Sequence, residues 1–255
     1  DDLKALKRHD GNAIKVHLKI DTGMTRLGVP LDQAEVFLKE ANQIESIELE
    51  GLYSHFATAD EGDLSYANSQ LSKFNEVVKI AKKLDIYPTF IHCSNSGAIL
   101  NVKESRFNMV RAGMLLYGAF PSDEVPQELP IKPVMTFTAP VVEIRDVKAG
   151  THISYGGVYT TKSDTRIAVV QAGFADGVPR PWYIDGFVKF KDQNFKITGR
   201  ICMDQLMIDF ENEYPKEGEE VLFFGKRGDD KISIEKIADT LNTTPYVLLT
   251  SIGGR

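Results

Sequence analysis

Two cations, Lys19 and Arg26, lie seven positions apart at the end of an alternating segment near the start of the chain. Residues 14–20 alternate between apolar and polar side chains, which predicts a strand, and Gly23 then interrupts it. In barrels of parallel strands, reactive residues usually lie just past the carboxyl ends of the strands. Lys19 and Arg26 are therefore candidate functional residues. A solvated turn is the alternative, because lysine is usually exposed.

The composition is that of a globular chain with an acidic charge balance. Of its 255 residues, 42% are hydrophobic and 26% are charged, which allows one large domain or two smaller ones. The formal net charge is −6. A nucleic acid or an anionic membrane would favour a basic face, so neither is expected as a partner.

Cysteine usage and hydropathy indicate the compartment. Two cysteines, Cys93 and Cys202, are too few for a disulfide framework and favour a reducing environment. No apolar run approaches the roughly 20 residues that span a bilayer, and residues 1–4 lack a signal-peptide core. We expect a soluble, cytoplasmic protein. The chain does not begin with Met, so we also expect it to be a piece of a longer protein.

Strands and helices are predicted to alternate up to residue 131. This alternation implies parallel strands with crossover helices, in either a β/α barrel or an open doubly wound sheet. Ser65 is the expected cap of the longest helix. The predicted strands span residues 14–20, 47–53 and 89–92, the helices 31–41, 65–84 and 94–100, and an extended segment 109–117.

From residue 132 onward the pattern changes to short strands separated by turns. Four prolines between residues 121 and 133 mark the boundary, which predicts domains at 1–131 and 132–255. One helix is expected, at 233–241. The predicted strands span residues 134–138, 140–144, 165–170, 186–190, 195–198, 205–210 and 220–224.

Seven segments, in order along the chain, resemble the motifs of alanine racemases. The resemblance implies an α/β plus β fold: the C-terminal part of a (β/α)8 TIM-type barrel that binds pyridoxal 5′-phosphate, followed by a mostly β-strand domain. It implies an isomerase that interconverts L-alanine and D-alanine through an aldimine and supplies D-alanine for peptidoglycan. The segments are residues 19–28, 54–60, 92–96, 110–118, 153–156, 173–177 and 199–204.

The family's Schiff-base lysine lies in a Lys-Ala-Asn-Ala-Tyr-Gly type motif on the first barrel strand. That string is absent from this sequence. By resemblance, the chain is expected to start near the fourth barrel strand and to stop before the family's last few residues. On this expectation, residues 1–255 alone cannot racemise an amino acid.

By resemblance, Tyr155 is the second base of a two-base mechanism. Free tyrosine has a pKa near 10, so it needs nearby cations or hydrogen bonds to act as a base, and His55 and Arg26 are the implied supports. Arg111 is implied to face the pyridine nitrogen, where it donates a hydrogen bond and keeps its own proton. His92 is implied to orient Arg111. Alternatively, Tyr155 is a turn aromatic and His92 is purely structural.

A phosphate site is implied at Ser96 together with the backbone amides of Gly113 and Met114. A short helix is expected to begin at residues 94–96, and its free N–H groups would favour an anion. Gly113 would let the backbone approach closely. The alternative for Ser96 is a simple helix cap.

Three further roles follow from the resemblance. Arg26 would bind the cofactor's phenolic oxygen and the substrate carboxylate, as a fork of donors can. Lys19 matches a lysine that is often carbamylated and positions this arginine, although an ordinary lysine remains possible. The Met203 amide would receive the substrate carboxylate. Because Met203 and Tyr155 come from the other subunit in the family, a homodimer with shared active sites is implied.

Two departures from the family pattern affect the substrate. Phe174 stands where tyrosine is common, and Gly254 lies where many members have a phosphate-contacting tyrosine. A serine or broad-specificity racemase therefore remains an alternative to one for alanine.

Other classes also remain open. A decarboxylase with the same cofactor would need a carboxylate in the place of Arg111. A metal-dependent barrel hydrolase could use His55, Asp60 and His92, although their spacing is loose for a metal site. A non-catalytic binding protein is the last alternative.

Overall fold

The computed structural model describes residues 5–6, 10–211, 213 and 215–253. The chain divides into two compact units. The N-terminal unit runs to Leu115 and includes Phe120–Leu129, and the C-terminal unit comprises Leu116–Ala119 and everything from Pro130 onward. Each unit has its own core and is described separately.

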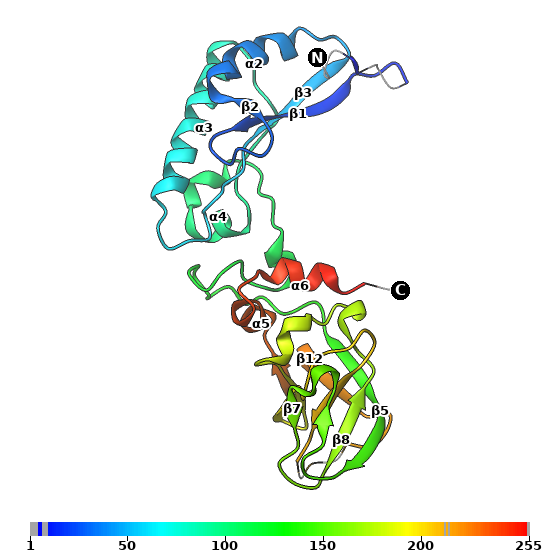
Figure 1. Cartoon of the computed structure of the whole chain (residues 1–255). Coiled ribbons are helices and arrows are strands. Elements are labelled where there is room, and N and C mark those ends of the chain that lie inside the picture. Colours follow the sequence, from blue (N-terminus) through cyan, green and yellow to red (C-terminus); the bar gives the residue numbers. More distant parts are fainter. Residues whose placement is uncertain (1–4, 7–9, 212, 214, 254–255) are drawn as a thin grey trace. The chain divides into compact units, whose positions relative to one another are not determined.

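The N-terminal unit is a parallel sheet with crossover helices (Figure 1). The strand order is β2-β1-β3-β4, and every described pairing in this sheet is parallel. The predicted α/β arrangement is therefore confirmed for this unit. The strands are β1 (Ile14–Asp21), β2 (Val29–Pro30), β3 (Ile47–Tyr53) and β4 (Phe90–His92), and the helices are α2 (Ala34–Asn42), α3 (Ser65–Lys83) and α4 (Ser96–Asn101), with 3-10 turns η1 (Leu31–Gln33) and η2 (Lys103–Arg106).

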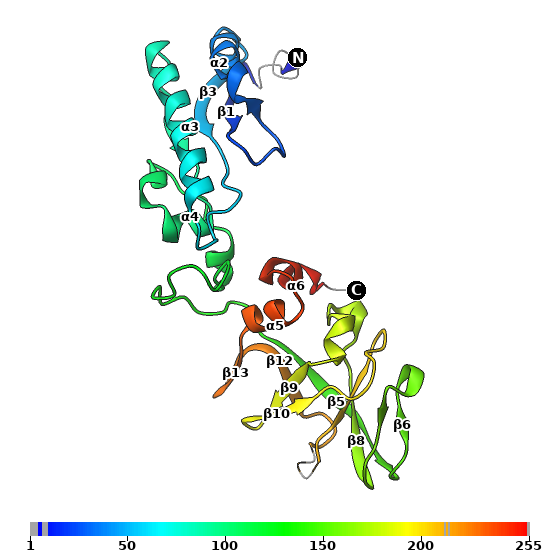
Figure 2. The same cartoon turned by 60° about the vertical axis from the view of Figure 1, so that its left-hand side comes forward.

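Helices α2 and α3 lie side by side along the sheet (Figures 1 and 2). Apolar side chains recur on α3 at three- and four-residue intervals, and Leu71, Phe74 and Val78 are buried in the same cluster as Leu18 and Leu52 of the strands. The prediction of a helix starting at residue 65 is confirmed. Its cap is different from the one expected.

Ser65 is the first residue of α3 and not its cap. The Asp63 carboxylate accepts the Ser65 N–H at 2.9 Å, so an acidic side chain satisfies one of the free amides of the first turn. Aspartate performs this role as well as serine does, which is why the sequence alone did not distinguish the two.

The prediction of an extended segment at 109–117 is wrong. Residues 109–113 form no strand, and η3 (Met114–Tyr117) is a 3-10 turn. The Asn108 side chain accepts the Ile91 N–H at 2.8 Å and donates to the Thr89 carbonyl at 2.7 Å. These are backbone groups at the edge of β4 that a neighbouring strand would otherwise use, so a side chain takes the place of the predicted strand.

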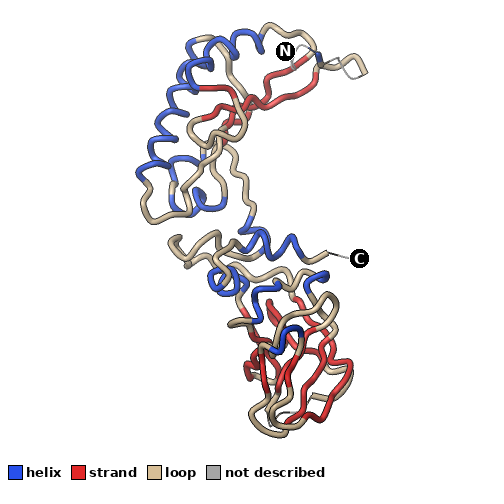
Figure 3. Tube along the Cα trace, in the orientation of Figure 1, coloured by secondary structure: helices blue, strands red, loops and turns tan. Residues whose placement is uncertain are grey.

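The C-terminal unit is rich in strands (Figure 3), and their described pairings are antiparallel. The order is β10-β9-β12-β5-β8-β11, with β13 paired to β12, and β6 and β7 form a separate ribbon. The predicted mostly β character is confirmed. The strands are β5 (Phe137–Val147), β6 (His152–Ile153), β7 (Tyr159–Thr160), β8 (Thr165–Val170), β9 (Phe187–Phe190), β10 (Gln193–Lys196), β11 (Leu206–Asp209), β12 (Glu220–Arg227) and β13 (Asp230–Ile232).

Several details of this unit differ from the predictions, among them the short strands β6, β7 and β13, which were not expected. In place of the strands expected at 134–138 and 140–144 there is one strand, β5, which begins only at Phe137. It continues through Pro140, whose carbonyl still accepts the Gln171 N–H at 3.0 Å. A second helix was missed: α6 (Pro245–Ser251) follows α5 (Ile234–Thr240). Pro245 at the first helical position after Thr244 is a helix-start signal that the sequence did contain.

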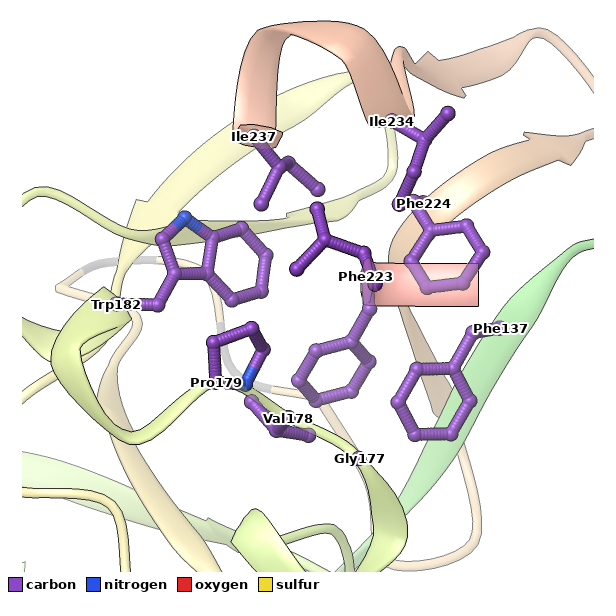
Figure 4. A pocket seen from close by; sticks show the side chains of 10 residues that line it. Phe137, Gly177, Val178, Pro179, Trp182, Phe223, Phe224, Ile234 and Ile237 are labelled. Atoms are coloured by element: carbon purple, nitrogen blue, oxygen red, sulfur yellow. The ribbon is translucent and has the colours of Figure 1, made fainter. Parts of the chain in front are cut away.

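The core of the C-terminal unit gathers aromatic side chains beneath α5 (Figure 4). Trp182 and Phe223 lie with ring centroids 6.3 Å apart, and Phe137 lies 5.0 Å from Phe223. The small cavity between them is lined by Gly177 and by apolar and aromatic side chains without a charged group, so we interpret it as a packing gap. None of the described helices combines the length and apolarity needed to cross a membrane.

Candidate active site

Arg111 is the centre of a polar cluster at the carboxyl ends of β3 and β4. Its Nη1 lies 2.6 Å from His92 Nδ1, and its Nη2 donates to the Ser54 carbonyl at 2.8 Å and lies 3.0 Å from His55 Nδ1. The Arg111 backbone N–H donates to the Ser94 carbonyl at 3.0 Å. Ser54 and His55 directly follow β3, and His92 ends β4, so the parallel sheet itself brings these groups together.

Both histidines of this cluster are neutral near pH 7. Burial lowers the pKa of His92 to about 4, and the positive charge of Arg111 acts in the same direction. Burial likewise lowers the pKa of His55 to about 4, with the charges of Arg111 and Arg26 adding to it. A neutral imidazole can accept a hydrogen bond from the guanidinium, whereas an imidazolium cannot.

The loop after β1 folds back on the end of its own strand. The Asp21 carboxylate accepts the N–H groups of Gly23 at 2.9 Å and Thr25 at 3.0 Å, which lowers the pKa of Asp21. Gly28 has φ +125°, and an added Cβ would lie 2.9 Å from the Asp21 nitrogen and 3.2 Å from Lys19 Cγ. Only glycine allows this close return of the loop.

Lys19 is half-buried under this loop, and Arg26 is exposed on it. Burial lowers the pKa of Lys19, the charge of Arg26 lowers it further, and Asp21 opposes them. The charge of Arg26 also acts on the pKa of His55. The two cations picked out by their spacing therefore belong to the same electrostatic environment as the Arg111 cluster.

Ser96 opens α4 and contacts the segment after Arg111. Its Oγ accepts the N–H groups of Gly113 at 2.9 Å and Leu115 at 3.5 Å. The helix cap is the neighbouring Asn95, whose side chain accepts the Ala98 N–H at 3.0 Å. The alternative interpretation of Ser96 as a simple helix cap is therefore wrong, because Asn95 is the cap.

The expected phosphate residues accordingly meet in one place. Gly113 bonds directly to Ser96, and Met114 is buried at the start of η3. The contact of the Leu115 N–H with Ser96 was not predicted, because a hydrogen bond from the backbone does not depend on the type of side chain.

Tyr155 lies on the C-terminal unit, in the 3-10 turn η4 (Tyr155–Gly157), and 64% of the residue is exposed. The preceding Ser154 has φ +62°, and its Oγ donates to the Arg200 carbonyl at 2.6 Å. This bond joins the turn to the segment that carries Met203, which is 56% exposed. The local backbone at Tyr155 is therefore a turn, which agrees with the alternative description of this residue as a turn aromatic.

Phe174 belongs to the same surface. Its backbone N–H donates to the Cys202 carbonyl at 3.0 Å, and the Ala175 N–H donates to the Met203 carbonyl at 3.0 Å. Three of the predicted motif segments, 153–156, 173–177 and 199–204, are thus joined by hydrogen bonds within the C-terminal unit. Gly254 lies outside the described residues.

No group of three or more His, Cys, Asp or Glu side chains in the described part of the chain is arranged to hold a metal ion. His55 and His92 bond to Arg111 instead of converging with Asp60. A cation at the centre of the cluster disfavours binding of a metal cation there.

Two family models match the sequence: "Alanine racemase, N-terminal domain" over residues 1–121 and "Alanine racemase, C-terminal domain" over residues 134–255. The chain belongs to the alanine racemase family. A curated alanine racemase of Halothermothrix orenii is 42% identical over 94% of this chain. Another, from Desulfovibrio desulfuricans, is 37% identical over the full length of the chain.

Solved alanine racemases share the fold. The enzyme from Clostridium difficile 630 matches with a TM-score of 0.89 at 38% identity, over 95% of this chain and 63% of that one. The Bacillus anthracis alanine racemase with bound L-Ala-P matches with a TM-score of 0.87 at 37% identity, over 96% of this chain and 64% of that one. The Bartonella henselae enzyme, with covalently bound pyridoxal phosphate, matches with a TM-score of 0.82 at 28% identity, over 94% and 64%.

The recognition of the family and the predicted fold class, a β/α barrel part followed by a mostly β domain, are confirmed by these matches. The chain spans 64% of the length of the Halothermothrix orenii relative and 68% of the Desulfovibrio desulfuricans relative.

Proposed function

We propose that the complete protein containing this chain is an alanine racemase that uses pyridoxal 5′-phosphate to interconvert L-alanine and D-alanine. The observation that carries the proposal is the Arg111 cluster, in which an arginine at the strand ends is held by neutral histidines and a backbone carbonyl. Membership of the family supports the same reaction.

The residues of the N-terminal unit fit this cofactor. Arg111 keeps its proton at physiological pH and offers a fork of donors, which suits the pyridine nitrogen. His92 would orient Arg111 for this contact, and Ser96 with the Gly113 and Met114 amides would hold the phosphate end. When bound, the cofactor would stabilise the negative charge that develops at the substrate Cα.

Two proton-transferring groups are needed on opposite faces of the substrate Cα. We assign one to Tyr155 and the other to a lysine outside this chain, since the family's lysine motif does not occur in the sequence. His55 is neutral and accepts a hydrogen bond from Arg111 at Nδ1, so its Nε2 carries the proton and can donate a hydrogen bond. Arg26 would favour the phenolate form of Tyr155 through its positive charge.

Arg26 and Met203 are our candidates for binding the substrate carboxylate, Arg26 through its guanidinium and Met203 through its backbone amide. Lys19 is a candidate for carbamylation. Its lowered pKa raises the fraction of neutral amine, which is the form that adds CO2 with loss of a proton. The resulting carbamate would be an anion beside Arg26.

We also propose a homodimer with shared active sites, a cytoplasmic location, and the supply of D-alanine for peptidoglycan. The exposed Tyr155 and Met203 support the dimer, because substrate-binding groups on a surface need a second surface to exclude water. The free cysteines Cys93 and Cys202 support a reducing compartment. We also propose that the domains of the chain are residues 1–131 and 132–255.

Serine is the second candidate substrate. Phe174 is exposed and has no hydroxyl with which to bond or exclude a serine side chain, and this is the specific observation in its favour. Comparing kcat/KM for the two amino acids in the complete protein would separate these possibilities.

The test of the proposed function is an assay of the complete protein with pyridoxal 5′-phosphate. L-alanine should yield D-alanine, and D-alanine should yield L-alanine, with a higher kcat/KM than serine. No interconversion of either amino acid by the loaded protein would refute the proposal.

A further inference from the structure

Three side chains stand in series behind Arg111. His92 Nδ1 lies 2.6 Å from Arg111 Nη1, and on the other side of the ring His92 Nε2 lies 2.7 Å from His17 Nδ1. His17 Nε2 in turn lies 3.4 Å from Glu50 Oε2. The series runs from the candidate active site to a carboxylate at the protein surface.

The chemistry of its two ends gives the series a single direction. Arginine can only donate hydrogen bonds and an ionised carboxylate can only accept them. His92 therefore accepts at Nδ1 and donates from Nε2 to His17 Nδ1. His17 must then carry its proton on Nε2, facing Glu50. Both rings are fixed as the same neutral tautomer, and every donor in the series faces an acceptor.

A register shift in the sheet builds this arrangement. Val16 of β1 pairs with Leu49 of β3, but His17 pairs with Gly51, so Glu50 is an extra residue in β3. A bulge of this kind re-aims a side chain. At Gly51 an added Cβ would lie 2.3 Å from His17 Nδ1, so the missing side chain provides the space that the imidazole fills.

Neighbouring groups hold the members in place. The His92 ring stacks on Tyr53 at 5.0 Å with an interplanar angle of 8°, and the His17 ring stacks on Phe90 at 5.8 Å. The Lys15 Nζ donates to Glu50 Oε1 at 2.7 Å, which leaves Oε2 for His17. The planes of the rings, and with them the directions of their hydrogen bonds, are therefore set by packing.

We propose that His17 and Glu50 are positioning residues that hold His92 as the neutral Nε2–H tautomer and so fix the guanidinium of Arg111. The last step, from Arg111 to the pyridine nitrogen, depends on the proposed function. A carboxylate acting through two polarisable imidazoles makes His92 Nδ1 a stronger acceptor for Arg111, as a carboxylate does for a metal-ligating histidine.

The test uses the complete protein labelled with ¹⁵N-histidine and ¹⁵N-arginine, without cofactor or substrate. Imidazole ¹⁵N shifts identify each tautomer, and solvent exchange of the Arg111 Nη protons reports how firmly the guanidinium is held. The variants are Glu50→Ala and Glu50→Gln. The matched control is Glu48→Ala, which removes a carboxylate from the exposed face of the same strand.

In the unsubstituted protein, both His17 and His92 should give the neutral Nε2–H signature. Glu50→Ala should shift His17 toward a mixture of tautomers and speed exchange of the Arg111 protons by roughly two- to tenfold, the loss of about one hydrogen bond. Glu50→Gln should largely restore both readouts, since its amide oxygen still accepts. Glu48→Ala should match the unsubstituted protein.

A His17 that is charged or protonated at Nδ1 near pH 7 would overturn the proposal. So would unchanged tautomers and unchanged Arg111 exchange in Glu50→Ala. Because no cofactor is present in this experiment, a failed racemase assay would leave its outcome untouched. Conversely, a working racemase with the wrong tautomers would refute the positioning role alone.

Discussion

The two units present their candidate functional residues in opposite ways. In the N-terminal unit, Arg111, His92 and His55 are bonded to one another at the ends of buried strands. In the C-terminal unit, Tyr155 and Met203 lie on turns with most of their surface exposed. The first unit thus holds a preassembled polar cluster. In the second, the candidate groups are open to solvent, and under the proposed function they act only when another surface covers them.

Substituting Tyr155 should separate function from stability most strongly. Tyr155→Phe in the complete protein should lower racemisation by roughly 10²- to 10⁴-fold, the usual contribution of one acid–base group. The free energy of unfolding should stay within about 0.5 kcal/mol, because the side chain is exposed. Tyr87→Phe, another exposed tyrosine, is the control. Unchanged rates in both directions would remove Tyr155 from the mechanism.

Substituting Arg111 should affect function and stability together. Arg111→Met should lower kcat/KM by about 100-fold or more, since a misplaced cofactor is misaligned for every step. It should also lower the free energy of unfolding by roughly 1–3 kcal/mol, because the Ser54 carbonyl and His92 lose their donor. Arg145→Met, on an exposed strand position, should change neither by much. Equal stability of the two variants would contradict the preassembled site.

Acid should weaken the N-terminal unit first. The pKa of His92 is about 4 in the folded chain and near 6.5 when unfolded, so the unfolded state binds the proton first as pH falls. The stabilisation is complete above pH 6.5 and declines toward pH 4, by an amount on the order of 3 kcal/mol for this buried ring.

Hydrogen–deuterium exchange followed by peptide mass spectrometry measures this in each unit separately. Between pH 7 and pH 4, after correction for intrinsic exchange rates, peptides of β3 and β4 should lose more protection than peptides of β8 and β12. A His92→Asn variant should show a smaller loss. Equal losses in both units would indicate that acid acts on the molecule as a whole.

The smallest predicted effect concerns the glycine beside the His17 ring. Gly51→Ala should lower the free energy of unfolding by about 1–3 kcal/mol, because the new methyl group overlaps the imidazole. Denaturant unfolding measures this change. Gly253→Ala, where an added Cβ meets nothing within 4 Å, should be near neutral. A neutral Gly51→Ala would mean that His17 can move aside, which would weaken its positioning role.

Much of the fold could be predicted because its elements have regular periods. The alternation in β1 and the apolar stripe of α3 are properties of single segments, and both elements appear where expected. The prediction of an extended segment at 109–117 was wrong because the Asn108 side chain bonds the backbone groups that a neighbouring strand would use. A contact of this kind has no periodic pattern in the sequence. The prediction of two separate strands in place of β5 was wrong because Pro140 was interpreted as a break. Its carbonyl still accepts a hydrogen bond from a neighbouring strand end.

The candidate site was predicted only through the order of its motifs. Arg111, His92 and His55 are far apart in sequence, and the pairing of β3 with β4 brings them together. The contribution of His17 and Glu50 depends on a register shift between two strands, which a single sequence does not encode visibly. His17 shares the polar face of β1 with Lys19, and this was the one available signal.

Cofactor affinity in two variants tests the contrast between the units most directly. Pyridoxal 5′-phosphate would be titrated into the complete Tyr155→Phe and Arg111→Met proteins, followed by its absorbance. We predict a Kd within about twofold of the unsubstituted protein for Tyr155→Phe, and a Kd raised roughly tenfold or more for Arg111→Met, equivalent to one charge-assisted hydrogen bond. An equal loss of affinity in both variants would contradict a preassembled cofactor site in the N-terminal unit.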